Sequence, residues 1–204
     1  RGLGDVYKRQ SPVGTTELIA ETFKKRGVDL SKIYISYCPE RVLPGNVMHE
    51  LVENDRVIGG VDEKSTQKAV SFYSKYVKGE LHSTNSRTAE MCKLVENSSR
   101  DVQIAFANEL SLICDKADIN VWELINLANK HPRVNILQPG CGVGGHCIPV
   151  DPYYLSWIGK KNNSPLTLLS KFQPPLYLTE CCKLTTDQKI GRDRAPVSYT
   201  HLRA

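Results

Sequence analysis

The segment GGHCIPVD, residues 144–151, joins a glycine-rich turn to one cysteine and one acidic residue. Gly144 and the glycine after it have no side chain, so backbone amides at this turn can come close to a ligand. Cys147 follows the turn, and the start of a helix there would favour its thiolate, which is the nucleophilic form. The alternative is a turn beside a small buried cysteine, because free cysteine is often buried.

A second group of polar residues, Lys93, Asn97 and Arg100, is spaced as i, i+4 and i+7. In a helix this spacing places all three side chains on one face. Lysine and arginine on such a face could hold an oxyanionic or polyanionic ligand, and a desolvated lysine can take part in proton transfer. The alternative is an ordinary solvated polar face.

Glu40 follows Pro39 where a predicted strand ends. Ligands of parallel sheets bind outside the carboxyl ends of the strands, so Glu40 is a candidate site residue. The alternative is that Glu40 forms an ion pair with Arg41.

His131 and Arg133 begin a polar loop that leads into the cysteine turn. The alternative for this pair is the end of a helix, which Pro132 would help to terminate. His146 and Cys147 make a poor metal site, because adjacent residues rarely reach one ion and no further ligand cluster accompanies them. The sequence therefore predicts no metal centre.

The first half of the chain alternates predicted strands with helices, which favours an α/β fold with a parallel sheet. Residues 11–16 are typical of a strand end that leads into a helix capped by Thr15 or Thr16. The predicted strands are 33–37, 56–60 and 79–84, and a helix is predicted over 63–77.

From Arg87 the pattern becomes helical. Residues 87–117 lack glycine and proline and predict one helix about 46 Å long, with its apolar residues on the face opposite Lys93. A helix of this length often bridges domains or forms a subunit interface. Shorter helices are expected over 120–130 and after Asp151.

The 204-residue chain has a formal charge of +5, and 40% of its residues are hydrophobic. Much of the charge lies in residues 1–10 and 192–204, so it does not predict a nucleic-acid-binding surface. Neither end continues the periodicity of its neighbour. We therefore expect residues 1–10 and 173–204 to be non-native or divergent tails.

The cysteine pattern and the hydropathy predict a cytoplasmic protein with reduced thiols. The seven cysteines form no CxxC pair, and Cys92 and Cys114 fall within helical patterns. No apolar run approaches the roughly 18 residues that span a membrane, and no signal peptide is visible. Neither a membrane nor a nucleic acid is expected as a partner.

Three separated segments together resemble the UDP-glucose/GDP-mannose dehydrogenase family. They are CPERVLPG at 38–45, AEMCKLVENSSRD at 89–101 and HPRVNILQPGCGVGGHCIPVDP at 131–152. The resemblance covers about residues 11–172. It implies the end of a Rossmann-like NAD-binding domain over 11–86, and a central helical domain over 87–172 that forms a homodimer.

The resemblance also implies a reaction. A UDP-sugar C6 alcohol would be oxidised to a carboxylate with two NAD+ and one water, and the wording of the motifs favours UDP-N-acetyl-D-mannosamine over UDP-N-acetylglucosamine or UDP-glucose. Cys147 would form a thiohemiacetal and then a thioester. Lys93 would accept the alcohol proton, with Asn97 as its partner, and Asp151 would support the lysine or activate water. Glu40 would lie near the hydrolytic water. The implied substrate contacts are Arg41, Val42, Arg100, His131, Arg133 and Gly144.

The sequence departs from the family pattern at both ends. Gln10 stands where the family has threonine, and the GxGxxG fingerprint and the C-terminal UDP-binding domain are expected outside this chain. The pattern also changes after Phe172. We therefore assign no cofactor contacts and expect this polypeptide alone not to turn over substrate.

Two other classes remain open from the sequence. A cysteine hydrolase or acyltransferase would need a histidine base near Cys147 but would not need Lys93. A non-enzymatic dimerisation module would use the long helix alone.

Overall fold

The computed structural model describes residues 11–42, 45–140, 148 and 150–164. Its contacts divide the chain into two units, one ending at Glu96 and the other beginning at Asn97. The division falls inside one continuous helix, α5 (Ser86–Lys116). Each unit is described in turn.

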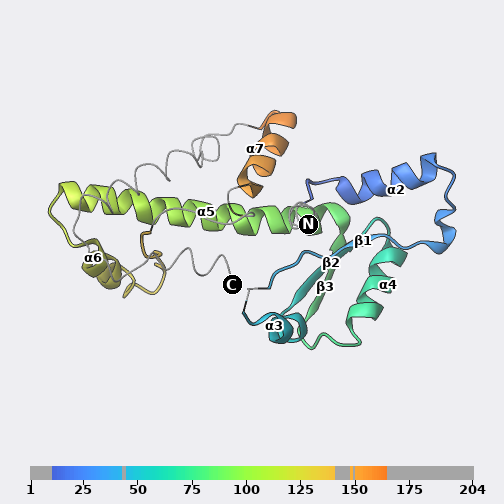
Figure 1. The fold of residues 1–204 in the computed structure, drawn as a ribbon, viewed down its shortest axis with the longest axis horizontal. Coiled ribbons are helices and arrows are strands. Elements are labelled where there is room, and N and C mark those ends of the chain that lie inside the picture. Colours follow the sequence, from blue (N-terminus) through green and yellow to red (C-terminus); the bar gives the residue numbers. More distant parts are fainter. Residues whose placement is uncertain (1–10, 43–44, 141–147, 149, 165–204) are drawn as a thin grey trace. The chain divides into compact units, whose positions relative to one another are not determined.

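The first unit contains a three-stranded sheet in the order β1-β2-β3 (Figure 1). Strands β2 (Arg56–Gly60) and β3 (Leu81–Asn85) pair in parallel, as the sequence predicts. The expectation of a fully parallel sheet is wrong for β1 (Ser36–Tyr37), which pairs antiparallel to β2. Only two residues of the predicted strand join the ladder, and strand composition does not specify direction.

Helix α4 (Glu63–Tyr73) packs against β2 and β3. Asp62 caps it by accepting a hydrogen bond from the Ser65 amide at 2.7 Å. Gly60 permits this close packing, because a Cβ there would lie 2.5 Å from the Thr66 amide nitrogen. The predicted helix over 63–77 is therefore confirmed as an element but ends four residues early.

Two short elements were not predicted, the 3-10 turn η2 (Leu30–Lys32) and helix α3 (Val47–Glu53). Helix α3 lies between β1 and β2 in the chain. Its end is tied to the segment before β3, because the Lys78 amide donates to the Val52 carbonyl at 2.7 Å.

Helix α2 (Thr15–Lys25) begins after Gly14, which has a φ of 95°. The predicted threonine cap is wrong. The Thr15 hydroxyl donates to the Pro12 carbonyl, and the N-terminal amides of α2 instead reach the Glu90 carboxylate on α5. Residues 13 and 14 form a turn and not a strand end.

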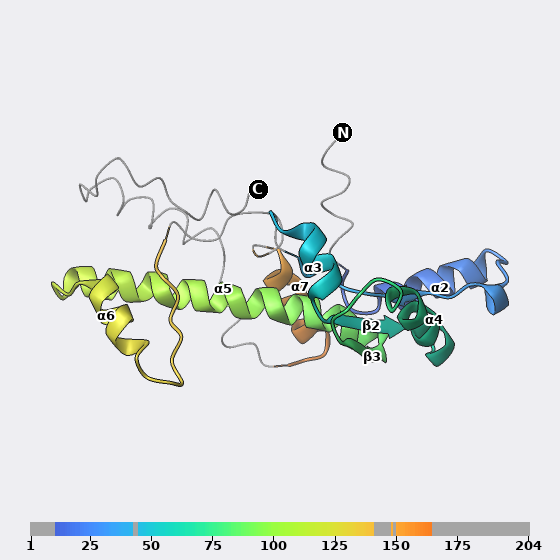
Figure 2. The same cartoon turned by 90° about the horizontal axis from the view of Figure 1, so that it is seen from below.

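Helix α5 confirms the predicted long helix, shifted by one residue (Figure 2). Its apolar residues do lie opposite Lys93 on the helix surface, but several face solvent. Val95, Phe106 and Ile113 are 47%, 54% and 62% exposed. The buried residues of α5 are both apolar and polar, and the polar ones include Glu90, Ser98, Asp101 and Asn108.

The second unit adds two shorter helices, α6 (Val121–Ala128) and α7 (Asp151–Lys161). Asn120 caps α6 through its side-chain oxygen, which accepts from the Trp122 and Glu123 amides. Both helices were predicted, although α6 is shorter than the expected 120–130. Within the described ranges, no helix is long and apolar enough to cross a membrane.

Candidate active site

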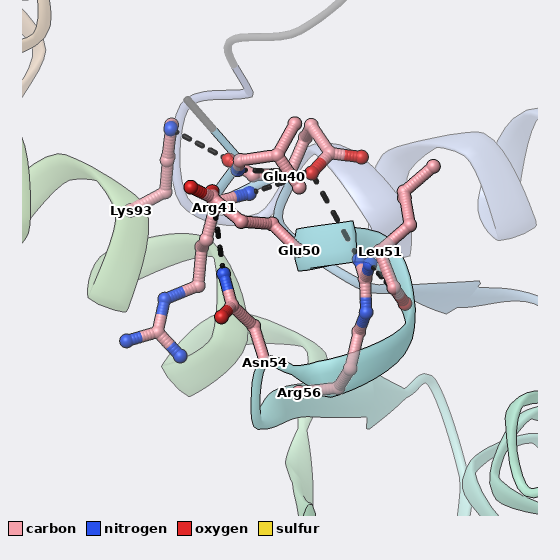
Figure 3. A network of polar contacts seen from close by, with 8 residues as sticks. Glu40, Arg41, Glu50, Leu51, Asn54, Arg56 and Lys93 are labelled. Carbon is pink, nitrogen blue, oxygen red and sulfur yellow. Dashed lines mark hydrogen bonds and ion pairs between the residues drawn. The ribbon is translucent and has the colours of Figure 1, made fainter. Parts of the chain in front are cut away.

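Lys93 and Glu40 come together although 53 residues separate them. The Lys93 Nζ donates to the Glu40 main-chain carbonyl at 2.7 Å (Figure 3). Glu40 lies in the loop after β1, and Lys93 lies on the second turn of α5. The lysine is therefore held against this loop and does not belong to a freely solvated face.

The Glu40 carboxylate turns back on its own loop. Its Oε1 accepts from the amides of Arg41 at 2.8 Å and Val42 at 3.2 Å. The expected alternative, an ion pair between Glu40 and Arg41, is wrong. The Glu40 carboxylate instead pairs with Arg56, whose Nη1 lies 3.9 Å from Oε1.

Arg41 pairs with a different acid. Its guanidinium contacts Glu96 on α5 at 2.9 Å, with both side chains partly exposed. Arg41 also lines a shallow depression with Asn54 and Asp55. The loop 40–42 thus has its charged groups fixed on both sides by residues distant in sequence.

Asn97 and Asp151 form a second pair, within the other unit. The Asn97 Nδ2 donates to the Asp151 carboxylate. Asp151 is the first residue of α7 and is fully buried. A negative charge at a helix N-terminus is electrostatically favoured, which helps to offset the burial of this carboxylate. Arg100, the third residue of the predicted face, is exposed.

His131 and Arg133 lie on an exposed loop after α6. The expected alternative, a role at the helix end, holds in part, because the His131 amide donates to the Ala128 carbonyl at 3.1 Å. Asn129, which the sequence reading missed, closes this loop. Its side chain exchanges two hydrogen bonds with the main chain of Ile136, at 2.9 and 2.8 Å.

Cys147 and Gly144 lie outside the described residues. Just before them in the chain, the Gly140 amide donates to the Asn108 Oδ1 at 2.8 Å. Asn108 is buried, and its Nδ2 has no hydrogen-bond partner among the described residues. Asn108 lies 11 residues, or about three helical turns, after Asn97 on α5. This spacing could have indicated from the sequence that the two residues share a helix face.

Burial raises the pKa of three groups in these units, one of which is Tyr73. Burial raises the pKa of Asp101 on α5 to about 6. It also raises the pKa of the Cys38 thiol, beside Tyr73 and Arg56. In the part of the chain that the structure describes, no group of three or more acidic, histidine or cysteine residues could hold a metal ion.

A dinucleotide would need a free helix N-terminus for its phosphates. At the start of α2 that position is filled, because the Glu90 carboxylate accepts from the Gly14 amide at 2.6 Å and the Thr16 amide at 2.8 Å. This N-terminus therefore does not fit a phosphate. We assign no dinucleotide contact to the described residues.

Two domain models of one family match most of the chain. The NAD-binding domain of the UDP-glucose/GDP-mannose dehydrogenase family matches residues 6–77, and the central domain of the same family matches residues 87–174.

Similar proteins include the UDP-N-acetyl-D-mannosamine dehydrogenases of Campylobacter jejuni and Escherichia coli K12. They are 60% and 58% identical over 159 residues, which is 74% of this chain and 39% and 38% of those proteins. The chain thus spans less than half of the length of these relatives.

The fold is similar to solved structures of the same kind. The UDP-D-ManNAc dehydrogenase of Pyrococcus horikoshii is 42% identical with a TM-score of 0.78, over 86% of this chain and 42% of that chain. The UDP-N-acetyl-mannosamine dehydrogenase of Staphylococcus aureus is 41% identical with a TM-score of 0.69, over 91% and 43%. With both domain models matching in order, the chain belongs to the UDP-glucose/GDP-mannose dehydrogenase family.

Proposed function

We propose that this chain is part of an NAD-dependent dehydrogenase that oxidises the C6 alcohol of UDP-N-acetyl-D-mannosamine to the carboxylate. The identity of about 60% to enzymes named for this sugar supports the choice of substrate. The observation that carries the proposal is that α5 supplies both Lys93, held at Glu40, and Asn97, held at Asp151.

Each of the two pairs suits a separate need of the reaction. Lys93 accepts the alcohol proton as a neutral amine, and the ammonium so formed later stabilises an oxyanion. The Glu40 main-chain carbonyl orients its Nζ for both roles. Asn97 keeps one face of Asp151 occupied, which orients this carboxylate beside the start of α7. Glu40 is partly exposed, so its carboxylate can bind the water that hydrolyses the thioester.

The proposed chemistry balances as two oxidations and one hydrolysis. The alcohol loses a proton and a hydride to give an aldehyde, and the Cys147 thiolate adds to the aldehyde carbon. Loss of a second hydride gives a thioester, and water then releases the carboxylate and the thiol. NAD+, when bound, supplies the hydride acceptor for both oxidations.

Arg41, Val42, Arg100, His131, Arg133 and Gly144 remain our proposed substrate contacts. Arginine suits a diphosphate because its donors form a planar fork. Arg133 and His131 are exposed on a loop closed by Asn129, which leaves both side chains accessible to a ligand.

A chimera tests the proposal. Residues 11–164 would replace the aligned segment of the Campylobacter jejuni relative, which supplies the rest of the enzyme. We expect two NADH for each UDP-N-acetyl-D-mannosamine, and less activity with UDP-N-acetylglucosamine or UDP-glucose. A correctly folded chimera that forms no NADH from any of these sugars would refute the proposal.

Two substitutions in the chimera separate this reaction from a cysteine hydrolase. Cys147→Ser should abolish turnover, and Lys93→Met should lower kcat by about 10²–10⁴-fold. A hydrolase would keep its activity without Lys93, so full activity of the Lys93→Met chimera would favour that class.

We also propose that the protein is a cytoplasmic homodimer that pairs through the central helical domain. The exposed apolar stripe of α5, formed by Val95, Phe106 and Ile113, supports this pairing. The free thiols of Cys38, Cys92 and Cys114 support a reducing compartment.

A further inference from the structure

Arg56, the first residue of β2, is a buried charged side chain that the proposed reaction does not use. It is 5% exposed. An arginine cannot lose its charge in a protein, so its burial carries a desolvation cost of several kcal/mol unless partners offset it. The partners of Arg56 therefore indicate why the residue is there.

Four groups lie near the Arg56 guanidinium, from Leu51, Glu40, Tyr73 and the Cys38 thiol. Figure 3 draws the first two. The Arg56 Nη2 donates to the Leu51 carbonyl of α3 at 3.1 Å. Its Cζ lies 5.8 Å from the centroid of the Tyr73 ring. Its Nη1 lies 3.9 Å from the Glu40 carboxylate, which is 40% exposed.

These contacts do not fully satisfy the guanidinium. Its Nε is buried and has no hydrogen-bond partner among the described residues. Replacing a buried ion pair by apolar side chains is often neutral or stabilising, so stability alone does not account for an arginine here. A role toward Glu40 does account for it.

We propose that Arg56 is a positioning residue that holds the Glu40 carboxylate from the protein side. With the carboxylate fixed between Arg56 and the amides of Arg41 and Val42, the Glu40 carbonyl is left to accept from Lys93. Arg56 thus orients both polar groups of Glu40 without touching substrate. Only the catalytic consequence of this inference rests on the proposed function.

Amide hydrogen exchange in the 204-residue chain tests the positioning directly. Arg56→Met removes the charge and keeps a long side chain, whereas Arg56→Lys keeps a cation and loses the planar fork. We expect the Arg41 and Val42 amides to exchange about threefold faster or more in Arg56→Met, and less so in Arg56→Lys.

The exchange rates of two other amides distinguish a displaced Glu40 carboxylate from partial unfolding of the first unit. The Gly60 amide donates to the Thr66 hydroxyl at 2.9 Å and reports the sheet. The Lys78 amide donates to the Val52 carbonyl and reports the docking of α3. Unchanged Arg41 and Val42 amides, or faster exchange at Lys78 alone, would overturn the proposal. The control Arg87→Met removes an exposed arginine paired with Glu17 and should alter neither loop amide.

Should Arg56→Met unfold the first unit, Arg56→Lys and Arg56→Gln decide the matter. Arg56→Gln removes the charge, keeps a polar side chain and leaves the Glu40 carboxylate in place, so it should speed exchange at Arg41 and Val42 while Gly60 and Lys78 keep their rates. If neither variant speeds exchange at the loop amides, the proposal is wrong.

The chimera tests the effect of Arg56 on catalysis. Arg56→Lys should lower kcat by about tenfold or more and leave KM for the UDP-sugar within about threefold, because Arg56 does not contact substrate. An inactive unsubstituted chimera would refute the proposed function and leave the exchange result to decide on Arg56. An active chimera in which Arg56→Lys raises only KM would overturn the positioning role.

Discussion

Glu90 is a buried acid on α5 that acts as the N-terminal cap of another helix. Its carboxylate accepts from the amides of Gly14 and Thr16 and from the Thr16 hydroxyl. We expect Glu90→Ala to lower the free energy of unfolding by about 2–3 kcal/mol, because buried donors lose a charged partner. Chemical denaturation measures this loss.

The control for Glu90 is Gln103→Ala, at an exposed position of the same helix. It should change stability by less than about 0.5 kcal/mol. Equal effects of the two substitutions would show that Glu90 is not a specific cap.

The burial of Asp101 on α5 lowers the free energy of unfolding in a pH-dependent way. Its pKa is raised by burial from 3.8 to about 6, so between these values the folded state binds more protons than the unfolded state. Stability should therefore fall as pH rises through about 4 to 6, by at most about 3 kcal/mol. Asp101→Asn cannot ionise and should lack this fall.

Urea unfolding at pH 4.5 and 7.5 measures the difference. Asp101→Asn should gain stability over the parent chain at both pH values, and the gain should be larger at pH 7.5. Asp118→Asn, at an exposed position just after α5, is the control. Parallel pH profiles for Asp101→Asn and the parent chain would contradict the prediction.

Residue types and spacing indicated candidate site residues, but they did not indicate the contacts of these residues. The spacing of Lys93 and Asn97 predicts one helix face for both, and each forms a hydrogen bond within its own unit. Helical periodicity could not reveal that Glu40 contacts Arg56 rather than Arg41, because this choice depends on how α3 and β2 fold back in space. The roles assigned to Cys147 and Gly144 stay predictions.

At the scale of elements, the loop after α6 depends on one side chain. Asn129 binds both main-chain groups of Ile136 and so closes the segment that carries His131 and Arg133. In the chimera, Asn129→Ala should raise KM for the UDP-sugar by about threefold to tenfold with little change in kcat, because a loosened loop binds at an entropic cost.

The matched control is Asn120→Ala, which removes the cap at the other end of α6. It should cost about 1 kcal/mol of stability and leave KM unchanged. A rise in KM for both variants would mean that the helix and not the loop is responsible.

The strongly periodic elements were predicted well, and the short ones were not. Helix α5 follows from 31 residues without a helix breaker. Helix α3 has only seven residues, and β1 pairs through two, so tertiary contacts decide their form more than local sequence does. The cap of α2 failed for the same reason, because its acceptor lies 74 residues away.

For the whole molecule, the exposed apolar stripe of α5 predicts self-association. Phe106 and Ile113 are seven residues apart and more than half exposed. If a second copy covers this stripe, Phe106→Glu should convert the dimer to a monomer at micromolar concentration, because a buried unpaired charge is costly. Sedimentation velocity on the 204-residue chain measures the change.

Phe72→Glu is the control for this prediction. Phe72 is 58% exposed on α4, on the first unit, and its substitution should leave the oligomeric state unchanged. A parent chain that sediments as a monomer would refute pairing through α5.

The ion pair between Arg41 and Glu96 has a consequence for how ligand affinity responds to ionic strength. An anionic ligand that recruits Arg41 must displace the Glu96 carboxylate, which already neutralises the guanidinium at 2.9 Å. The loss of the Arg41–Glu96 pair therefore offsets part of the electrostatic energy that the ligand gains by pairing with Arg41. Added salt weakens both competing pairs together, so affinity should fall less steeply with salt than a count of the arginines at the site suggests.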